Sequence, residues 1–385
     1  MTSKAIIAGR LFDGEEWHHD HAVLFSNGVI DALAPAAQLP ADAEIVETVD
    51  LLAPGFIDLQ VNGGGGVLFN DGPSADAIAR ICAAHARFGT TALLPTLITD
   101  TPAITKATLE AGRQAAANRV PGFIGLHLEG PHLSLARKGA HDPNLIRPMR
   151  QPDLDLILAY ASDFETLLTT VAPENVTRDQ VTAMADAGVV VSLGHSDTSY
   201  ATAVDYARAG ARMVTHLFNA MSPLGHREPG VVGAALDNGG LYAGLIADGF
   251  HVACASMAIA LRAKAGPARI FLVTDAMSPI GTDLEGFTLN GRQIHRHGGR
   301  LTLDDGTLAG ADIDMLSSVR FLHERIGLPL EEALRMASLY PAEAIGVTHR
   351  RGALKSGLVA DFVTLTDALD MDSTWIGGRK VFAAS

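Results

Sequence analysis

Two histidines, each directly after a short apolar run, are the first candidates for chemistry in this chain of 385 residues. His195 lies in GHSD, after VVVSL, and His216 follows twenty-one positions later in THLFNA, after ARMV. Glu129 ends the run GFIGLHLE, and Asp275 lies near the end of IFLVTDA. Two imidazoles and one carboxylate can hold a catalytic divalent metal and leave one coordination position for water. We therefore predict that Glu129, His195 and His216 bind a metal ion.

The donor types also indicate which metal and which base belong to such a site. Imidazole and carboxylate suit zinc, and they suit iron or cobalt less decisively. Asp275 would be the nearby base that takes a proton from the attacking water. A single buried histidine is usually a satisfied core residue, so the prediction depends on all four residues together.

These residues follow apolar runs that alternate with helical patterns, several of which end in a C-cap glycine. Eight such runs over about 225 residues match a (β/α)8 barrel, whose active site lies at the carboxyl ends of its strands. We predict this TIM-like barrel. A doubly wound sheet is the alternative, but no G-x-G-x-x-G follows an early strand. The predicted strands are 55–61, 91–98, 122–129, 165–172, 189–195, 212–218, 241–248 and 270–276.

Both ends of the chain contain short strand-like runs separated by glycine and asparagine. KAIIAG and HAVLFSNGVI lie in residues 1–53, and ADFVTLTDAL lies in residues 347–385. We expect the two ends to pair into one small β-sandwich domain. The barrel, residues 54–346, would lie between them.

The composition excludes several classes of protein. A net charge of −14 gives no basic surface for nucleic acid, and 48% hydrophobic residues argue against disorder. The chain lacks a signal-peptide pattern and any apolar stretch of the ~20 residues that a membrane span needs, so we expect a soluble cytoplasmic protein that does not bind membranes. Cys82 and Cys254 are too few for a disulfide framework, and we expect both to be buried thiols.

An ordered set of motifs gives the chain a resemblance to a known family. From about residue 50 to 315 the sequence contains PGFIDLQVNG, HLEGP, KGAH, VSLGHSD, THLFNAM, REPG, ADGFHV, LVTDAM and GTLAG. Together these resemble the N-acetylglucosamine-6-phosphate deacetylases, a family of the amidohydrolase superfamily. The resemblance implies metal-dependent hydrolysis of N-acetyl-D-glucosamine 6-phosphate to D-glucosamine 6-phosphate and acetate, in amino-sugar catabolism.

The resemblance also implies roles for residues that match the motifs. Glu129, His195 and His216 look like the metal ligands and Asp275 like the general base. His141 looks like the histidine that polarises the substrate near its acetyl group. The expected substrate contacts are Ala140, Asn219, Ala220, Arg227, Asp248, His251, Leu308, Ala309 and Gly310.

Two positions depart from the expected pattern. Many amidohydrolases carry His-x-His after the first strand and bind a second metal there, whereas this chain has Gln60 and Asn62. Neutral amides are poor zinc ligands, so we expect one ion per subunit, although a second-metal role for this pair stays open. His132 stands where a larger aromatic residue is expected, either as a neutral substitution or at the substrate entrance.

Arg227 lies on the long segment MSPLGHREPGVVG, and its guanidinium group is suited to phosphate. In the resembling family the matching arginine comes from the neighbouring subunit. We therefore expect a homodimer in which Arg227 reaches the partner's site.

Three alternative functions stay open. The same chemistry could act on N-acetylgalactosamine 6-phosphate, which differs at one ring hydroxyl. An amidohydrolase for a non-phosphorylated N-acyl substrate is a second alternative, against which Arg227 argues. The third is a metal-free protein that only binds sugar phosphates.

Overall fold

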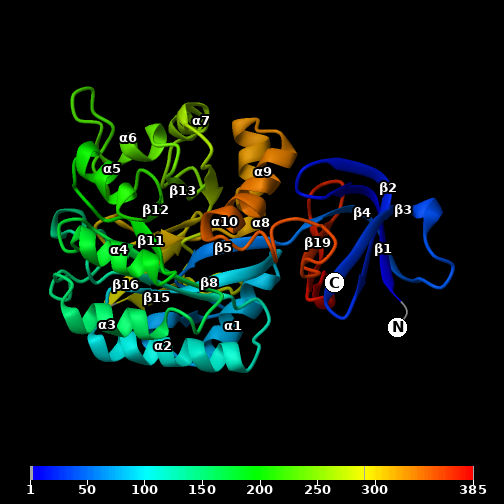
Figure 1. Cartoon of the computed structure of the whole chain (residues 1–385), viewed down its shortest axis with the longest axis horizontal. Coiled ribbons are helices and arrows are strands. Elements are labelled where there is room, and N and C mark those ends of the chain that lie inside the picture. Colours follow the sequence, from blue (N-terminus) through cyan, green and yellow to red (C-terminus); the bar gives the residue numbers. More distant parts are fainter. Residues whose placement is uncertain (1–2, 290, 385) are drawn as a thin grey trace.

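The computed structural model describes residues 3–289 and 291–384. Its centre is a barrel of eight parallel strands, each hydrogen-bonded to the next in the chain (Figure 1). A bridge between Val61 and Ala276 joins the first strand to the end of the last and closes the barrel. The predicted (β/α)8 barrel is confirmed. Its strands are β5 (Phe56–Val61), β8 (Thr90–Ile98), β9 (Gly125–Glu129), β10 (Thr166–Val171), β11 (Val190–Leu193), β12 (Ala211–Val214), β13 (Tyr242–Leu245) and β14 (Ile270–Leu272).

A helix follows each barrel strand and covers the outside of the barrel. Helices α1, α2 and α5 begin after Ser74, Thr101 and Ser199, whose side chains accept a hydrogen bond from the backbone N–H three residues later. Such caps satisfy donors that the first helical turn leaves unpaired. The helices are α1 (Ala75–Ala86), α2 (Pro102–Ala117), α3 (Gln151–Tyr160), α4 (Arg178–Asp186), α5 (Tyr200–Arg208), α6 (Gly230–Asp237), α7 (Cys254–Ala263) and α8 (Met315–Phe321), with α9 (Leu330–Ala337) and α10 (Leu339–Ile345) after them.

Several barrel strands end earlier than predicted. Strands β11, β12 and β14 stop two or three residues before His195, His216 and Asp275. These three residues have φ of +47°, +27° and +53°, values that are uncommon for residues other than glycine. The left-handed backbone interrupts each strand at the rim of the barrel. Non-glycine residues in this conformation cluster at functional sites.

Strands from both ends of the chain form one seven-stranded, sandwich-like sheet beside the barrel (Figure 1). The two ends meet where β4 pairs antiparallel with β19, with Leu52 opposite Thr364. The expected pairing of the two termini is confirmed, and the boundaries at 53/54 and 346/347 remain our proposal. The sheet contains β1 (Lys4–Phe12), β2 (Trp17–Ser26), β3 (Val29–Pro35), β4 (Glu44–Pro54), β19 (Phe362–Leu365), β20 (Met371–Ile376) and β21 (Arg379–Ala383).

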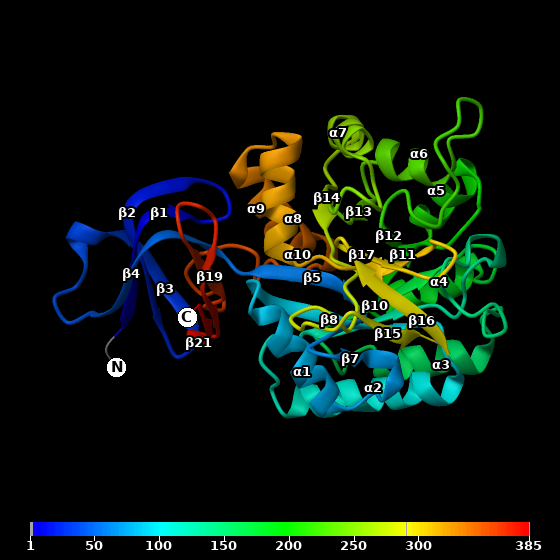
Figure 2. The same cartoon turned by 180° about the vertical axis from the view of Figure 1, so that it is seen from behind.

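A four-stranded antiparallel sheet, which lies outside the eight predicted barrel strands, is inserted between β14 and α8. Its strands lie across one end of the barrel (Figure 2). Leu289, Ile294 and Leu301 of this sheet pack in a small apolar cluster with Met277. The strands are β15 (Gly286–Leu289), β16 (Arg292–His297), β17 (Arg300–Thr302) and β18 (Leu308–Ala311).

The two cysteines differ in environment. Cys82 is buried, as predicted, but Cys254 is exposed. The prediction for Cys254 is wrong because this residue starts α7, in a first turn that the fold leaves open to solvent. Among the described helices, none has the length and apolar character needed to cross a membrane.

Candidate active site

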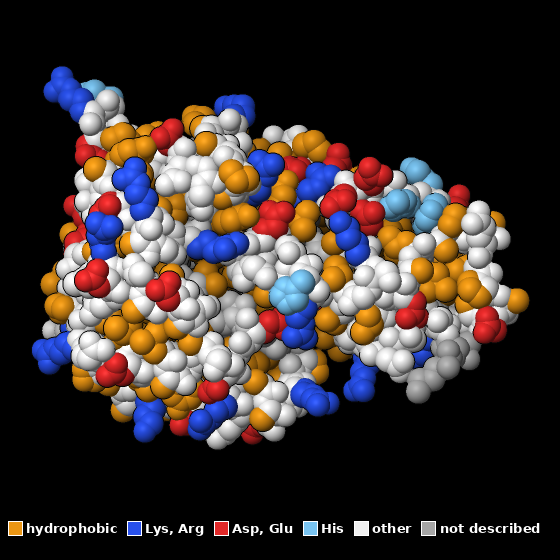
Figure 3. Space-filling view, in the orientation of Figure 1, with side chains coloured by type: hydrophobic (Ala, Val, Ile, Leu, Met, Phe, Trp, Pro, Cys, Tyr) orange, Lys and Arg blue, Asp and Glu red, His pale blue; other side chains and the backbone are white. Residues whose placement is uncertain are grey.

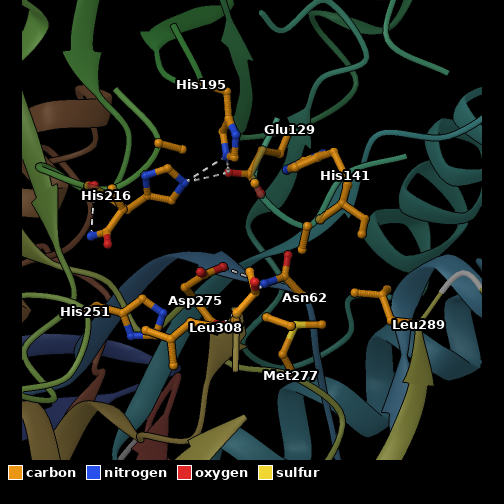
Figure 4. A pocket seen from close by; sticks show the side chains of 18 of the residues that line it. Asn62, Glu129, His141, His195, His216, His251, Asp275, Met277, Leu289 and Leu308 are labelled. Atoms are coloured by element: carbon orange, nitrogen blue, oxygen red, sulfur yellow. Dashed lines mark hydrogen bonds and ion pairs between the residues drawn. The ribbon is translucent and has the colours of Figure 1, made fainter. Parts of the chain in front are cut away.

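A cavity of about 420 Å³ lies at the carboxyl ends of the barrel strands (Figure 4). The inserted sheet forms one wall of it through Leu289 and the segment 306–310. Thirteen of the sixteen predicted site residues line this cavity, while Gln60, Asp248 and Arg227 do not. The thirteen are Asn62, Glu129, Ala140, His141, His195, His216, Asn219, Ala220, His251, Asp275, Leu308, Ala309 and Gly310.

Three donor atoms converge in the cavity wall. The Nε2 atoms of His195 and His216 are 3.1 Å apart, and they lie 3.3 Å and 3.1 Å from Oε1 of Glu129 (Figure 4). In a tetrahedral zinc site with bonds of about 2.0–2.1 Å, the ligand atoms are about 3.3 Å apart. The three side chains are buried. This buried Glu-His-His set fits one divalent metal ion.

His141 lies beside the same group, because one of its ring nitrogens is within 4.8 Å of ligand atoms of Glu129 and His195. Its Nδ1 accepts a hydrogen bond from the backbone N–H of Thr99 and lies 2.8 Å from the Thr99 hydroxyl, and the N–H donor favours the tautomer with the ring proton on Nε2. His195 has the opposite tautomer, since its Nδ1 donates to the carbonyl of Arg137 and leaves the Nε2 lone pair for a metal. These hydrogen bonds favour His216 over His141 as the third ligand.

The charges in the site depend on burial and on close neighbours. Burial opposes the charge of Glu129, but hydrogen bonds with His195 and His216 hold its pKa well below the usual value. Burial, together with the nearby His195, lowers the pKa of His141 to about 3 and keeps its ring neutral. Burial and the Glu129 charge raise the pKa of Asp275 to about 6. A carboxylate with this pKa is suited to exchange protons near neutral pH.

The two amides of the first barrel strand point at carboxylates. Asn62 Nδ2 donates to Oδ1 of Asp275 at 2.6 Å, and Gln60 Nε2 donates to the same oxygen at 3.1 Å. Gln60 Nε2 also donates to Oε1 of Glu129 at 3.0 Å. With both nitrogens occupied in this way, the pair resembles an anchor for Asp275 rather than a second metal site.

His251 also lines the cavity, and it is held by Asp248. Asp248 Oδ2 accepts from Nδ1 of His251 at 2.5 Å, and Oδ1 accepts from the backbone N–H groups of Phe250 and His251. Burial works against the charge of Asp248, but these hydrogen bonds hold its pKa below the usual value. Asp248 therefore orients His251 without lining the cavity itself. Asn219 is fixed close by, with Nδ2 donating to the backbone carbonyl of His216.

Arg227 lies outside the cavity of its own chain. It is exposed on the loop between β12 and α6, which projects beyond α5 in Figure 1. In Figure 3 this projection carries basic and histidine side chains at its tip. Among the described residues that line the cavity there is no lysine or arginine. The described lining of one chain's cavity thus offers a phosphate neither of these cationic side chains.

His132 is buried away from the cavity, with Nδ1 against the carbonyl of Arg147. It is not among the residues that line the cavity. Sequence reasoning missed Thr99, although it directly follows the second barrel strand, where a search for polar residues at strand ends would have found it. Leu289 gave no signal, because it belongs to the inserted sheet.

Comparisons with known proteins agree with this geometry. The profile of the amidohydrolase family matches residues 51–381, and that of the NagA composite domain matches residues 5–52. The chain is 41% identical to the N-acetylgalactosamine-6-phosphate deacetylase of Shewanella sp. (strain ANA-3), over 94% of this chain and 92% of that protein. It is 37% identical to the N-acetylglucosamine-6-phosphate deacetylase of Haemophilus influenzae, over 94% of each. The crystal structure of N-acetylglucosamine-6-phosphate deacetylase from Pasteurella multocida superposes with a TM-score of 0.94 at 32% identity, covering 99% of this chain and 100% of that one.

Proposed function

Because the chain belongs to the amidohydrolase family, we propose that it hydrolyses the N-acetyl group of an amino-sugar 6-phosphate to the free amine and acetate. The observation that carries this proposal is the convergence of Glu129, His195 and His216 in a cavity that also contains Asp275. Two relatives that are 37% and 41% identical to this chain over 94% of its length are named as deacetylases of such sugars.

We infer one divalent ion per subunit, held by Glu129, His195 and His216. Zinc suits this donor set best, with Fe²⁺ or Co²⁺ as alternatives. Such an ion, when bound, polarises the amide carbonyl and makes water a better nucleophile near neutral pH.

The side chains around the ligands supply the proton transfers. Asp275 takes a proton from the water that attacks the amide carbon, and it then gives that proton to the leaving nitrogen. His141, neutral and protonated on Nε2, donates a hydrogen bond to the carbonyl oxygen as negative charge develops there. Cleavage of the C–N bond releases acetate and the amine, with one water consumed.

The sugar phosphate is assigned to the side of the cavity formed by His251 and Asn219, with Ala140, Ala220 and the segment Leu308, Ala309 and Gly310 as further contacts. A phosphate dianion is bound best by a cationic side chain. None of the described residues that line the cavity of one chain is a lysine or an arginine. We propose that the chain is a homodimer in which Arg227 of one subunit reaches the other's site. Leu224, on the same loop, is 55% exposed, which suits a loop that packs against a second copy.

The substrate sugar has two candidates. N-acetylglucosamine 6-phosphate is our first choice, and the 41% identity to a relative named for the galactosamine compound supports N-acetylgalactosamine 6-phosphate as the second. Steady-state rates of acetate release from both sugars, with zinc present, will rank them. We expect unphosphorylated N-acetylglucosamine to be a much poorer substrate than either. Absence of acetate from both phosphates would contradict the proposed function.

A further inference from the structure

Two amides lie at the carboxyl end of β5, one within the strand and one directly after it, and both donate to the same atom. Gln60 and Asn62 are each only 2% exposed, and the side-chain nitrogens of both donate to Oδ1 of Asp275. Figure 4 shows Asn62 next to Asp275 at the floor of the cavity. Two N–H donors on one carboxylate oxygen fix the torsion angle of that side chain and engage that oxygen's lone pairs.

The second oxygen of Asp275 is in a different situation. Oδ2 accepts no hydrogen bond from the described part of the chain. It is also not one of the fully buried atoms without a partner, so it keeps some exposed surface. Since Asp275 lines the cavity and the two amides occupy Oδ1, Oδ2 is the oxygen left to accept a proton. The amides thus divide the carboxylate into an anchored oxygen and a reactive oxygen.

The backbone holds the amides at a fixed distance from Asp275. The N–H of Asp275 donates to the carbonyl of Gln60 at 2.9 Å, and the N–H of Asn62 donates to the carbonyl of Ala276 at 2.8 Å. Below them, the hydroxyl of Thr274 donates to the buried carboxylate of Asp58 at 2.5 Å. These bonds join β5 to the segment after β14 and close the barrel between its first and last strands.

The orientation of the Asn62 amide follows from its neighbours. Its Oδ1 is buried and has no partner among the described residues. Turning the amide over would bring that oxygen against Oδ1 of Asp275, where two acceptors repel each other. An apolar side chain at this position would leave no buried oxygen without a partner, so the amide oxygen adds no stability here. What the amide contributes is its N–H donor.

We propose that Gln60 and Asn62 are positioning residues that hold Oδ1 of Asp275 and direct Oδ2 at the attacking water. This inference rests on the proposed function, because it assigns Asp275 the role of base. It gives the two amides a task in proton transfer instead of metal binding.

The test compares Asn62→Leu, Asn62→Asp and Gln60→Leu with the wild type. Asp is nearly the same size as Asn, so a packing role would make Asn62→Asp the mildest change at this position. A positioning role predicts the reverse, because a second carboxylate repels Asp275. We expect kcat to fall about 10-fold for the two leucine variants and about 10²-fold for Asn62→Asp, with KM nearly unchanged. Bound metal should be unchanged in the two Asn62 variants, whereas Gln60→Leu also removes a hydrogen bond to Oε1 of Glu129.

Gln180→Leu is the matched control. Gln180 is half-buried at the start of α4, where its amide donates to the carbonyl of Met149 and accepts from the backbone N–H of Thr177, and none of these residues lines the cavity. This control should lose thermal stability and keep its kcat. If Asn62→Asp is more active than Asn62→Leu, or if the Asn62 variants lose their metal in elemental analysis, the inference is wrong.

A crystal structure of Asn62→Leu gives a readout that does not depend on turnover. We expect the carboxylate of Asp275 to be rotated or to adopt more than one conformation. An unchanged carboxylate would overturn the inference, whether or not the wild type releases acetate. Absence of acetate release by the wild type would count separately, against the proposed function.

Discussion

The Nε2 atoms of His195 and His216 face each other at 3.1 Å, and both lie within 3.3 Å of one oxygen of Glu129. The two histidines are close because β11 and β12 are adjacent parallel strands, so that residues just past their carboxyl ends meet at one rim. In a buried site, three donor atoms at this spacing match the ligand atoms around a single divalent cation.

The first prediction separates the two candidates for the third metal ligand. His216→Ala should lose tightly bound metal, because its Nε2 belongs to the converging set. His141→Ala should keep the metal and lose kcat, because the ring nitrogen that faces away from Thr99 carries a proton. Elemental analysis of the purified variants measures the difference. Metal loss in His141→Ala with retention in His216→Ala would reverse the assignment.

The second prediction concerns pH. Burial and the charge of Glu129 raise the pKa of Asp275 to about 6 in the metal-free chain, and only the carboxylate form can accept a proton from water. Activity should therefore be present above this pKa and decline as the pH falls through it. A bound cation favours the carboxylate, so the acidic limb of kcat/KM should lie at or below about pH 6 in the loaded enzyme. A limb near pH 8 would be incompatible with Asp275 as the base.

The third prediction concerns the inserted sheet. Arg292 of β16 donates to the backbone carbonyl of Ala140 at 2.5 Å, and Ala140 directly precedes His141. Arg292→Ala should loosen this loop and lower kcat/KM by about 10-fold, while thermal stability changes little. Arg113→Ala, at an exposed site on α2, serves as the control. Equal kinetics in the two variants would show that the sheet does not position the His141 loop.

The fourth prediction tests the composite site by mixing two inactive chains. Arg227→Ala should fail to bind phosphate well, and Asp275→Asn should lower kcat by roughly 10²–10⁴-fold. Hybrid dimers of the two should contain one intact site and regain part of the activity. If activity does not return after subunit exchange has been verified, Arg227 does not act across an interface.

Much of the site could be predicted from the sequence because it depends on one rule of the fold. Side chains that follow parallel strands meet at one end of the barrel, and this places Glu129, His195, His216 and Asp275 together without detailed coordinates. The tautomers of His141 and His195 could not be predicted, since they depend on hydrogen bonds to distant backbone groups. The hydrogen bond from Gln60 to Glu129 could not be predicted either, because it depends on the side-chain torsion angles of Gln60.

The inserted sheet was missed for a different reason. Its strands are three to six residues long and mostly exposed or half-buried, so they lack the continuous apolar runs that mark the barrel strands. Arg227 stays a prediction, because its assigned role lies in a second subunit. The wrong prediction for Cys254 came from reading an alanine-rich helix as buried throughout, whereas its first turn is open to solvent.

The fifth prediction, on metal stoichiometry, tests the central claim most directly. The protein is stripped of metal with a chelator, Zn²⁺ is returned in measured portions, and acetate release from N-acetylglucosamine 6-phosphate and N-acetylgalactosamine 6-phosphate is followed. A single site formed by Glu129, His195 and His216 predicts no activity without metal and a linear rise that stops at about one equivalent per chain. Full activity in the stripped protein, or a rise that continues to two equivalents, would contradict a deacetylase that works with one metal ion.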